Sequence, residues 1–158
     1  MNTLAVESVI NGAMGTCTAA IDGNIENMLY VKNIEVKVEK NKNEIKVLGQ
    51  TGAKHKANGW NGTGSMNVYY CTSKYRDMML EYMKKGIDTY FDITVENNDP
   101  STSIGRQTVV IKGVNLDSLI MAKLDIDSTE LDEDVDFTFE DIEILDRFGA
   151  VTSDAALE

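Results

Sequence analysis

The sequence predicts a mainly antiparallel β-barrel or β-sandwich with one α-helix at its side. Two periodicities lead to this prediction. Several segments alternate apolar and polar residues, as half-buried strands do, whereas residues 74–85 carry apolar side chains at helical spacing. The chain has 158 residues, 42% of them hydrophobic, which suits one domain over residues 1–158 built around one core.

The alternating segments predict seven strands, at residues 14–22, 28–40, 65–71, 88–96, 106–114, 118–126 and 134–145. Asp22 and Gly23 form a dipeptide typical of a hairpin turn at the end of the first strand. In the last segment, Val135, Phe137 and Phe139 fall on one face, and we expect that face to lie in the core.

The predicted helix spans residues 74–85 between two boundary signals. Thr72 or Ser73 can cap its start, and Gly86 is suited to the left-handed conformation that ends many helices. We expect the apolar stripe to pack on a sheet rather than to form a binding surface. This stripe comprises Tyr75, Met78, Met79, Tyr82 and Met83.

Residues 41–62 differ in composition from the segments around them. They are rich in Gly and Lys and poor in apolar residues, which fits either a long extended hairpin or a coil. We expect this segment to be an arm that contacts neighbouring subunits. Its candidate contact residues are Lys40, Lys42, Ile45, Lys46, Val47, Leu48, Lys54, Lys56 and Trp60. Residues 150–158 are expected to form a flexible tail.

Charge is distributed unevenly along the chain. Residues 32–56 hold seven Lys and three Glu, a net charge of +4, whereas residues 115–146 hold twelve acidic residues and one Lys, a net charge of −11. These regions are either two solvated surfaces or complementary surfaces that meet between identical copies. The acidic candidates for a contact with a neighbouring copy are Asp125, Asp127, Asp132, Glu133, Asp134, Asp136 and Glu140.

The sequence predicts no catalytic residue, no cofactor and no metal site, and hence not an enzyme. His55, the only histidine, lies between two lysines in the arm, which suits a solvated or interface residue better than a catalytic base. The run from Asp125 lacks the glycine of a calcium-binding EF-hand loop. Cys17 and Cys71 are expected to be reduced thiols. The net charge of −11 disfavours a general nucleic-acid or anionic-membrane binder.

Four segments closely resemble the core tail tube protein of contractile phages and phage-like particles of Gram-positive bacteria, the PBSX-type family. They are VEKNKNEIKVLG (38–49), HKANGWNGTGSMNVYY (55–70), TSKYRDMMLEYMKKGIDTYFDI (72–93) and LDEDVDFTFEDIEIL (131–145). The similarity runs over roughly residues 8–149. The family includes infectious phages, tail-like bacteriocins and defective prophages alike.

The resemblance implies two packed antiparallel sheets with one flanking helix and a protruding hairpin. It also implies hexameric rings that stack into the inner tube of a contractile tail, which conducts DNA or punctures an envelope. In such a tube, the acidic candidates for a neighbour contact are also candidates for the wall of the lumen. Implied partners are further copies of the chain, the sheath, tape measure and baseplate proteins, and DNA as a non-specific cargo. Because no secretory signal or membrane span is evident, we expect assembly in the bacterial cytoplasm. The alternative is a β-barrel binding or adaptor module that forms no tube.

Overall fold

The computed structural model describes residues 3–151, and residues 152–158 of the predicted tail lie outside this range. The described part of the chain contains eight strands, one α-helix and a short 3-10 helix at Val6–Ser8. The strands are β1 (Gly15–Ile21), β2 (Asn24–Asn27), β3 (Val31–Ile45), β4 (Lys54–Tyr69), β5 (Phe91–Asn98), β6 (Arg106–Ser118), β7 (Asp132–Phe139) and β8 (Asp141–Asp146), and the helix α1 spans Lys74–Lys85. The predicted mainly β fold class with one helix is confirmed.

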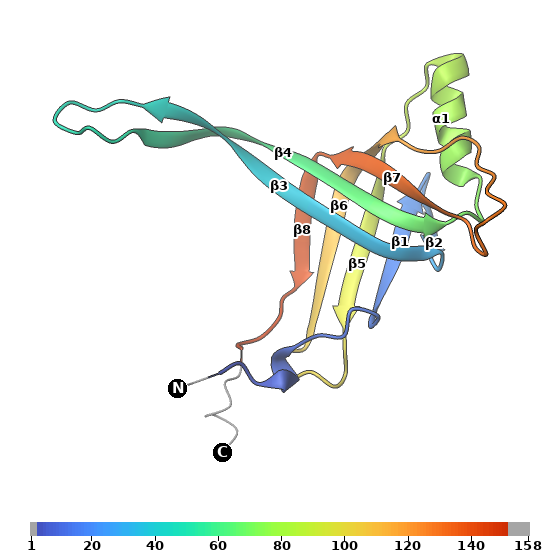
Figure 1. Ribbon diagram of the computed structural model, residues 1–158, viewed down its shortest axis with the longest axis horizontal. Coiled ribbons are helices and arrows are strands. Elements are labelled where there is room, and N and C mark those ends of the chain that lie inside the picture. The colour runs from blue at the N-terminus through green and yellow to red at the C-terminus, as the bar shows by residue number, and fades with distance from the viewer. Residues whose placement is uncertain (1–2, 152–158) are drawn as a thin grey trace.

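The strands form one continuous antiparallel sheet that bends into two halves (Figure 1). Its order is β2-β1-β5-β6-β7-β4-β3, and β8 also pairs with β6. Residues 108–112 of β6 pair with β8, and residues 115–118 pair with β7, so β6 belongs to both halves. A bulge opposite Asp92, with Gly113 at φ 68°, lies between these two stretches. The halves are thus joined through β6, and the sheet is not closed into a barrel.

The core lies between the two halves of the sheet. From one half, β4 and β7 contribute Met66, Val68, Val135, Phe137 and Phe139, all buried. From the other half, β1, β5 and β6 contribute Ala19, Ile21, Phe91, Ile93, Ile111 and Val114. The prediction that Val135, Phe137 and Phe139 share a buried face is confirmed, because alternate residues of a strand point to opposite faces.

Helix α1 begins and ends at the predicted residues. The Thr72 hydroxyl oxygen accepts a hydrogen bond from the backbone N–H of Lys74 at 3.3 Å, and Gly86 adopts the left-handed conformation at φ 69°. The ring of Tyr75 is buried and its hydroxyl lies 2.9 Å from that of Tyr30. The expectation that Tyr82 also packs on the sheet is wrong, since this side chain is 53% exposed.

Three expectations for the strands are corrected by the structure. Strand β2 was not anticipated; it pairs with β1 across the predicted turn at Asp22 and Gly23, both of which have positive φ. Residues 119–131 form a loop between β6 and β7 instead of continuing as a strand. The predicted strand 134–145 is interrupted at Glu140, whose N–H donates to the Lys112 carbonyl at 3.0 Å. Within residues 3–151, no helix is long and apolar enough to cross a membrane.

Candidate inter-subunit surfaces

Strands β3 and β4 extend together far beyond the body of the protein as a two-stranded ribbon (Figure 1). Their pairing continues as far as Ile45 opposite Lys54, with a bulge near Asn41. We call residues 40–60 the arm. Of the two readings of residues 41–62, hairpin or coil, the structure confirms the hairpin. In the sequence, the hairpin is favoured by Ile45, Val47 and Leu48, which interrupt the polar run.

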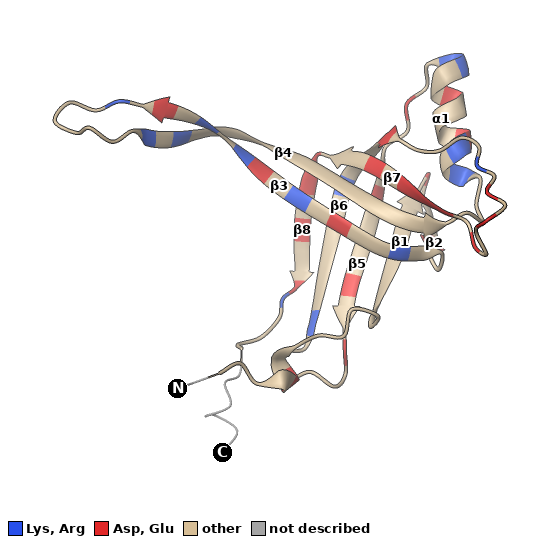
Figure 2. Cartoon of the chain, viewed as in Figure 1, with Lys and Arg blue, Asp and Glu red and all other residues tan. Residues whose placement is uncertain are grey.

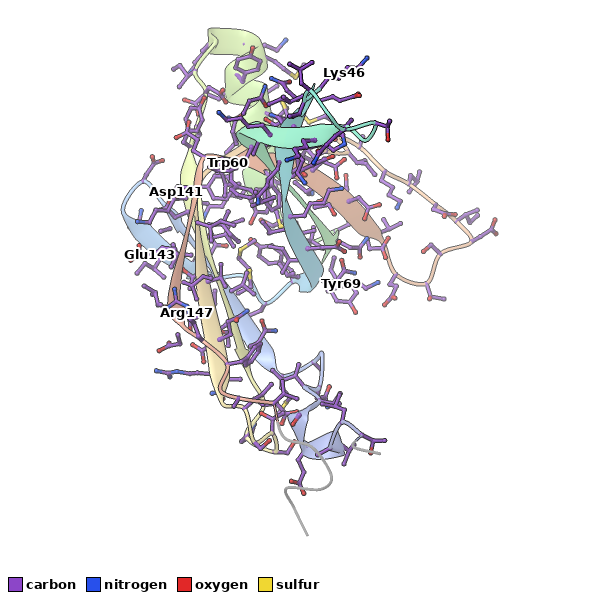
Figure 3. The ribbon with its side chains drawn as sticks, turned by 90° about the vertical axis from the view of Figure 1, so that its left-hand side faces the viewer. Lys46, Trp60, Tyr69, Asp141, Glu143 and Arg147 are labelled. Atoms are coloured by element: carbon purple, nitrogen blue, oxygen red, sulfur yellow. The ribbon has the colours of Figure 1, made fainter. Side chains whose placement is uncertain are left out.

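Hydrophobic side chains on the arm are exposed to solvent. Leu48 at the tip is 100% exposed, while Ile45 and Val47 are 39% and 41% exposed. Trp60 lies at the root of the arm (Figure 3). Its ring centroid is 6.2 Å from that of Phe139. Trp60 also lines a shallow apolar hollow with Val38 and Ile142. The arm therefore presents apolar surface that its own subunit does not cover.

The arm is also basic. Among the described residues, no ion pair involves its lysines, which are Lys40, Lys42, Lys46, Lys54 and Lys56. His55 is exposed on the same ribbon, opposite Glu44. The lysine ammonium groups are consequently available to a negatively charged surface outside the subunit.

The predicted acidic residues separate into three groups. Asp125 and Asp127 lie in the exposed loop between β6 and β7. Glu140 lies at the junction of β7 and β8, where its side chain covers Gly113. The remaining four, residues 132, 133, 134 and 136, belong to β7, and strand alternation places them on different faces.

Asp132 is neutralised within the subunit. Its carboxylate accepts a hydrogen bond from Lys32 Nζ at 2.9 Å, and Lys123 Nζ lies 3.8 Å away. The hydrogen bond from Lys32 lowers the pKa of Asp132, and the same contact raises the pKa of Lys32. Asp132 thus holds β7 to the start of β3 and offers less charge to a neighbour.

Glu133 does not belong to any surface, so its placement among lumen or contact candidates is wrong. Its side chain is 1% exposed and its Oε2 accepts a hydrogen bond from Arg76 Nη1 at 2.6 Å. The alternation that buries Val135 and Phe137 also buries Glu133. The sequence hides this role because the residue lies within an acidic run.

Asp134 and Asp136 point away from the core and form part of an outer polar face. Across the strands, Asp136 is opposite Ser65, which is opposite Glu35. Lys37 and Asp117 join Glu35, Ser65 and Asp136 around a shallow hollow on this face. Glu35 is not among the acidic residues predicted from the sequence to contact a neighbour, although its alternation with Ile34 and Val36 indicates an outward-facing side chain.

The basic arm and the acidic loop lie at opposite ends of the molecule's longest axis (Figure 2). The arm projects to one side of the body. The carboxylates of the β6–β7 loop and of β7 gather at the other side, next to α1. The arm lysines and the carboxylates of the β6–β7 loop are therefore separated in space and cannot meet within one subunit, although Lys32 at the start of β3 pairs with Asp132.

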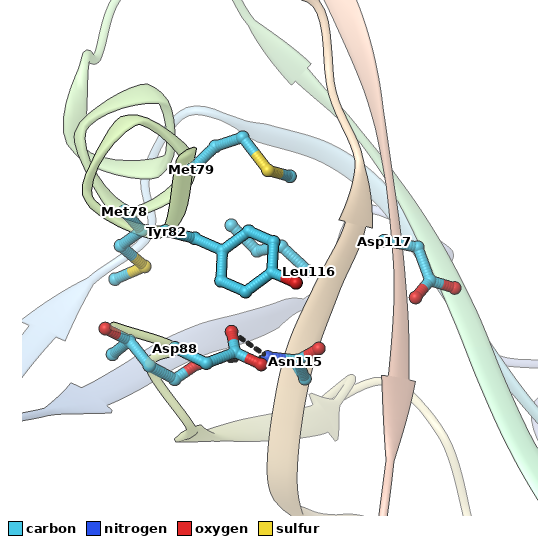
Figure 4. Close-up of a pocket in the computed structure, with 8 residues that line it drawn as sticks. Met78, Met79, Tyr82, Asp88, Asn115, Leu116 and Asp117 are labelled. Carbon is cyan, nitrogen blue, oxygen red and sulfur yellow. Dashed lines mark hydrogen bonds between the residues drawn. The ribbon is translucent and has the colours of Figure 1, made fainter. Parts of the chain in front are cut away.

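A further hollow lies between α1 and β6 (Figure 4). It is lined by Met78, Met79, Tyr82, Asp88, Thr89, Asn115, Leu116 and Asp117. On one side of it, Asn115 Nδ2 donates a hydrogen bond to Asp88 Oδ1 at 2.6 Å. Tyr82 and the neighbouring Met83 are exposed, so this end of the helix is an additional candidate for a contact between subunits. The expectation that the apolar stripe of α1 packs on a sheet had excluded this surface.

The described residues contain no group of three or more His, Cys, Asp or Glu side chains placed to hold a metal ion. Cys17 and Cys71 are both free thiols. Burial raises the pKa of Cys17 to about 11, so this thiol stays protonated at neutral pH.

Comparison with known proteins places the chain among tail components. The family described as phage tail tube protein matches residues 2–146. The phage-like element PBSX protein XkdM of Bacillus subtilis is 40% identical over 144 residues, which cover 91% of this chain and 95% of XkdM. A second Bacillus subtilis protein, YqbM, is 40% identical over 141 residues, 89% of this chain and 93% of YqbM.

Solved structures share the fold at low sequence identity. A chain of the sheath–tube complex of the extracellular contractile injection system PVC, in its extended state, matches with a TM-score of 0.67 and 11% identity over 88% of this chain and 93% of that chain. A chain of the sheath/tube terminator of the same system matches with a TM-score of 0.69 and 12% identity, over 90% of this chain and 100% of that chain.

Proposed function

The chain belongs to the phage tail tube protein family, and we propose that six copies of it form a ring and that the rings stack into a hollow tube. It is a structural subunit of a phage or phage-like contractile tail. The proposed role is mechanical and includes no catalytic step. Three surfaces of the subunit would serve this role: the arm, the acidic loop and the outer polar face.

The observation that carries the proposal is the placement of a basic arm and an acidic loop at opposite ends of one subunit. Identical copies that join through two different surfaces make a head-to-tail contact. Such contacts repeat to give a closed ring or an open filament, and a stacked tube contains both kinds of repetition. Opposite charges on the two surfaces favour this contact over a contact between two arms.

The arm is proposed to lie across an adjacent subunit or the next ring. In that position Val47 and Leu48, now exposed, would lose contact with water, and burial of apolar surface is worth roughly 25 cal/mol per Å². The arm lysines would meet carboxylates at the same time. Because the ribbon is already paired, its ordering costs less on assembly than that of a coil.

The outer polar face is proposed to line the channel. Four carboxylates lie on this face, and Lys37 lies among them; they are those of Glu35, Asp117, Asp134 and Asp136. Repeated six-fold in each ring of a subunit with a net charge of −11, they would repel the phosphates of DNA and let it slide. An electron cryomicroscopy map of the tube with a basic lumen would contradict this part of the proposal.

Partners beyond the chain itself follow from the proposed position in the tail. The outside of the tube would contact the sheath, its lumen would hold the tape measure protein and then DNA as a non-specific cargo, and its end would join the baseplate. The subunits are proposed to assemble in the bacterial cytoplasm.

Negative-stain electron microscopy of the purified protein tests the proposed assembly. Tubes, or rings with six-fold averages, are the expected result at neutral pH and low salt. A protein that remains monodisperse and monomeric at high concentration under these conditions would support an adaptor module and would contradict the proposed tube.

A further inference from the structure

The loop between β6 and β7 exposes two aliphatic side chains almost completely. Leu124 is 96% exposed and Ile126 is 97% exposed, and they alternate with Asp125 and Asp127. An alternation of apolar and charged residues is typical of a strand with one covered face. In the subunit, however, residues 122–125 pair with no strand. The segment has the pattern of a strand and lacks the partner.

This loop is held in place at both sides of the exposed segment. Before it, the Ile120 carbonyl accepts a hydrogen bond from Arg76 Nη1 at 3.0 Å. Beside it, Lys123 Nζ donates to the Asp132 carbonyl at 2.7 Å. The Asp127 N–H donates to Asp125 Oδ1 at 3.0 Å, which shapes the turn after Leu124. Leu124 and Ile126 are thus presented to solvent by an anchored segment.

The arm tip has the same alternation with the opposite charge. Ile45, Lys46 and Val47 alternate apolar and basic residues, and Leu48 follows. Lys54 lies opposite Ile45 in the ribbon, so a second ammonium group adjoins the tip. Both segments therefore offer exposed aliphatic side chains, with positive charges beside them on the arm tip and negative charges beside them on the loop. They lie at opposite ends of the long axis, so only two different copies can bring them together (Figure 2).

We propose that residues 124–127 of one copy are the docking site for the arm tip of another copy. The contact is made by side chains, because strand pairing in the ribbon ends at Ile45 and Lys54 and the tip beyond them is a loop. Leu124 and Ile126 cover Val47 and Leu48, and Asp125 and Asp127 face Lys46 and Lys54. This inference rests on the proposed self-assembly and assigns the site that receives the arm.

A reciprocal charge swap tests the docking site. The variant D125K/D127K and the variant K46E/K54E each place like charges at the contact, so each is expected to need at least about tenfold more protein to form tubes. The quadruple variant restores opposite charges with their positions exchanged and is expected to form tubes near the wild-type concentration. All four substituted positions are exposed to solvent. Circular dichroism checks that each variant is folded.

Two results of the swap would overturn the docking site. One is normal tube formation by both double variants. The other is a quadruple variant that assembles no better than either double variant, since a general charge effect is not rescued by exchange.

Disulfide trapping gives a second readout that does not depend on charge. In a Cys71→Ser background, L48C with I126C is expected to yield a ladder of covalent oligomers when assembled protein is oxidised, because the bond forms only when the two Cα atoms are within about 7 Å. The matched control is L48C with Y82C, which places the second thiol in the hollow beside α1. A ladder from the control and none from the first pair would show that the arm docks on α1 and would overturn the inference.

Replacing the arm distinguishes a failure of the docking site from a failure of the proposed role of the arm. If replacing the arm abolishes tubes while the charge swap and the trapping both fail, the arm acts in assembly but docks elsewhere. If tubes form without the arm, the proposed role of the arm fails and the docking site fails with it.

Discussion

Arg76 Nη1 lies 2.6 Å from Oε2 of Glu133, and this ion pair joins α1 to the buried face of β7. The guanidinium also donates hydrogen bonds to the carbonyls of Ile120 and Thr72, and it lies over the ring of Tyr70 with its carbon 4.3 Å from the centroid. One side chain thus holds the helix, the end of β4 and the root of the acidic loop together. The loop that we assign as the docking site depends on it for its position.

The substitution Arg76→Met is expected to destabilise the subunit by about 3–5 kcal/mol, because it leaves the carboxylate of Glu133 buried without its partner. Urea denaturation followed by circular dichroism measures the loss. Arg106→Met is the control: Arg106 pairs with Asp146 at 3.3 Å on the surface, and such pairs contribute about 1 kcal/mol or less. Equal losses in the two variants would show that the Arg76 pair is not a buried anchor.

The substitution Phe139→Ala is expected to cost about 3–5 kcal/mol, the usual range for truncating a buried Phe. Phe139 is 5% exposed, and it contacts Trp60 at the root of the arm. The cavity would therefore loosen both the core and the base of the ribbon. An unchanged midpoint of thermal unfolding would mean that the facing of β7 is wrong.

The substitution Gly62→Ala is expected to destabilise the subunit by about 1–3 kcal/mol through overpacking. A Cβ at this position would lie 2.4 Å from the ring of Phe139, its partner across the β4–β7 ladder. Gly12→Ala is the matched control, since no atom lies within 4 Å of its added Cβ. The midpoints of urea unfolding of the two variants are compared. Similar midpoints would show that the Phe139 ring does not fill the space next to Gly62.

The sequence predicted the helix to the residue because both ends carry local signals. Thr72 accepts a hydrogen bond from the N–H of Lys74 at the start of the helix, Gly86 ends the last turn, and neither signal depends on distant contacts. The strand predicted at 118–126 failed for the opposite reason. Its alternation is real, but a strand also needs a neighbour to pair with, and the subunit provides none.

For the candidate surfaces, the sequence distinguished residues 41–62 and the acidic run by composition, and their contacts with neighbouring subunits stay a prediction. It could not separate Glu133 from the acidic residues beside it, because burial depends on which face of β7 meets the core. It also assigned Tyr82 to the core from helical spacing, whereas Tyr75 and Met78 pack on the core and Tyr82 is exposed. Both errors concern facing, which is set by the packing of distant segments.

Stability is expected to fall in acid partly through Asp99. Hydrogen bonds from the Ser101 hydroxyl and from the backbone N–H groups of Asn11 and Ser101 lower the pKa of Asp99 below its usual 3.8. The stabilisation is complete above the unfolded pKa and is lost as pH falls through the folded one. Asp99→Asn should thus lower the thermal midpoint at pH 7 and make little difference near pH 2. A difference between the two proteins that is equal at both pH values would contradict this assignment.

The central claim is that the arm drives assembly while the body of the protein folds without it. The direct test replaces residues 42–57 by a short Gly-Ser linker and examines the purified protein by circular dichroism and negative-stain electron microscopy. The account predicts a folded, β-rich protein that forms no tubes at concentrations at which the wild type does. Tubes of normal length from the shortened protein would contradict it.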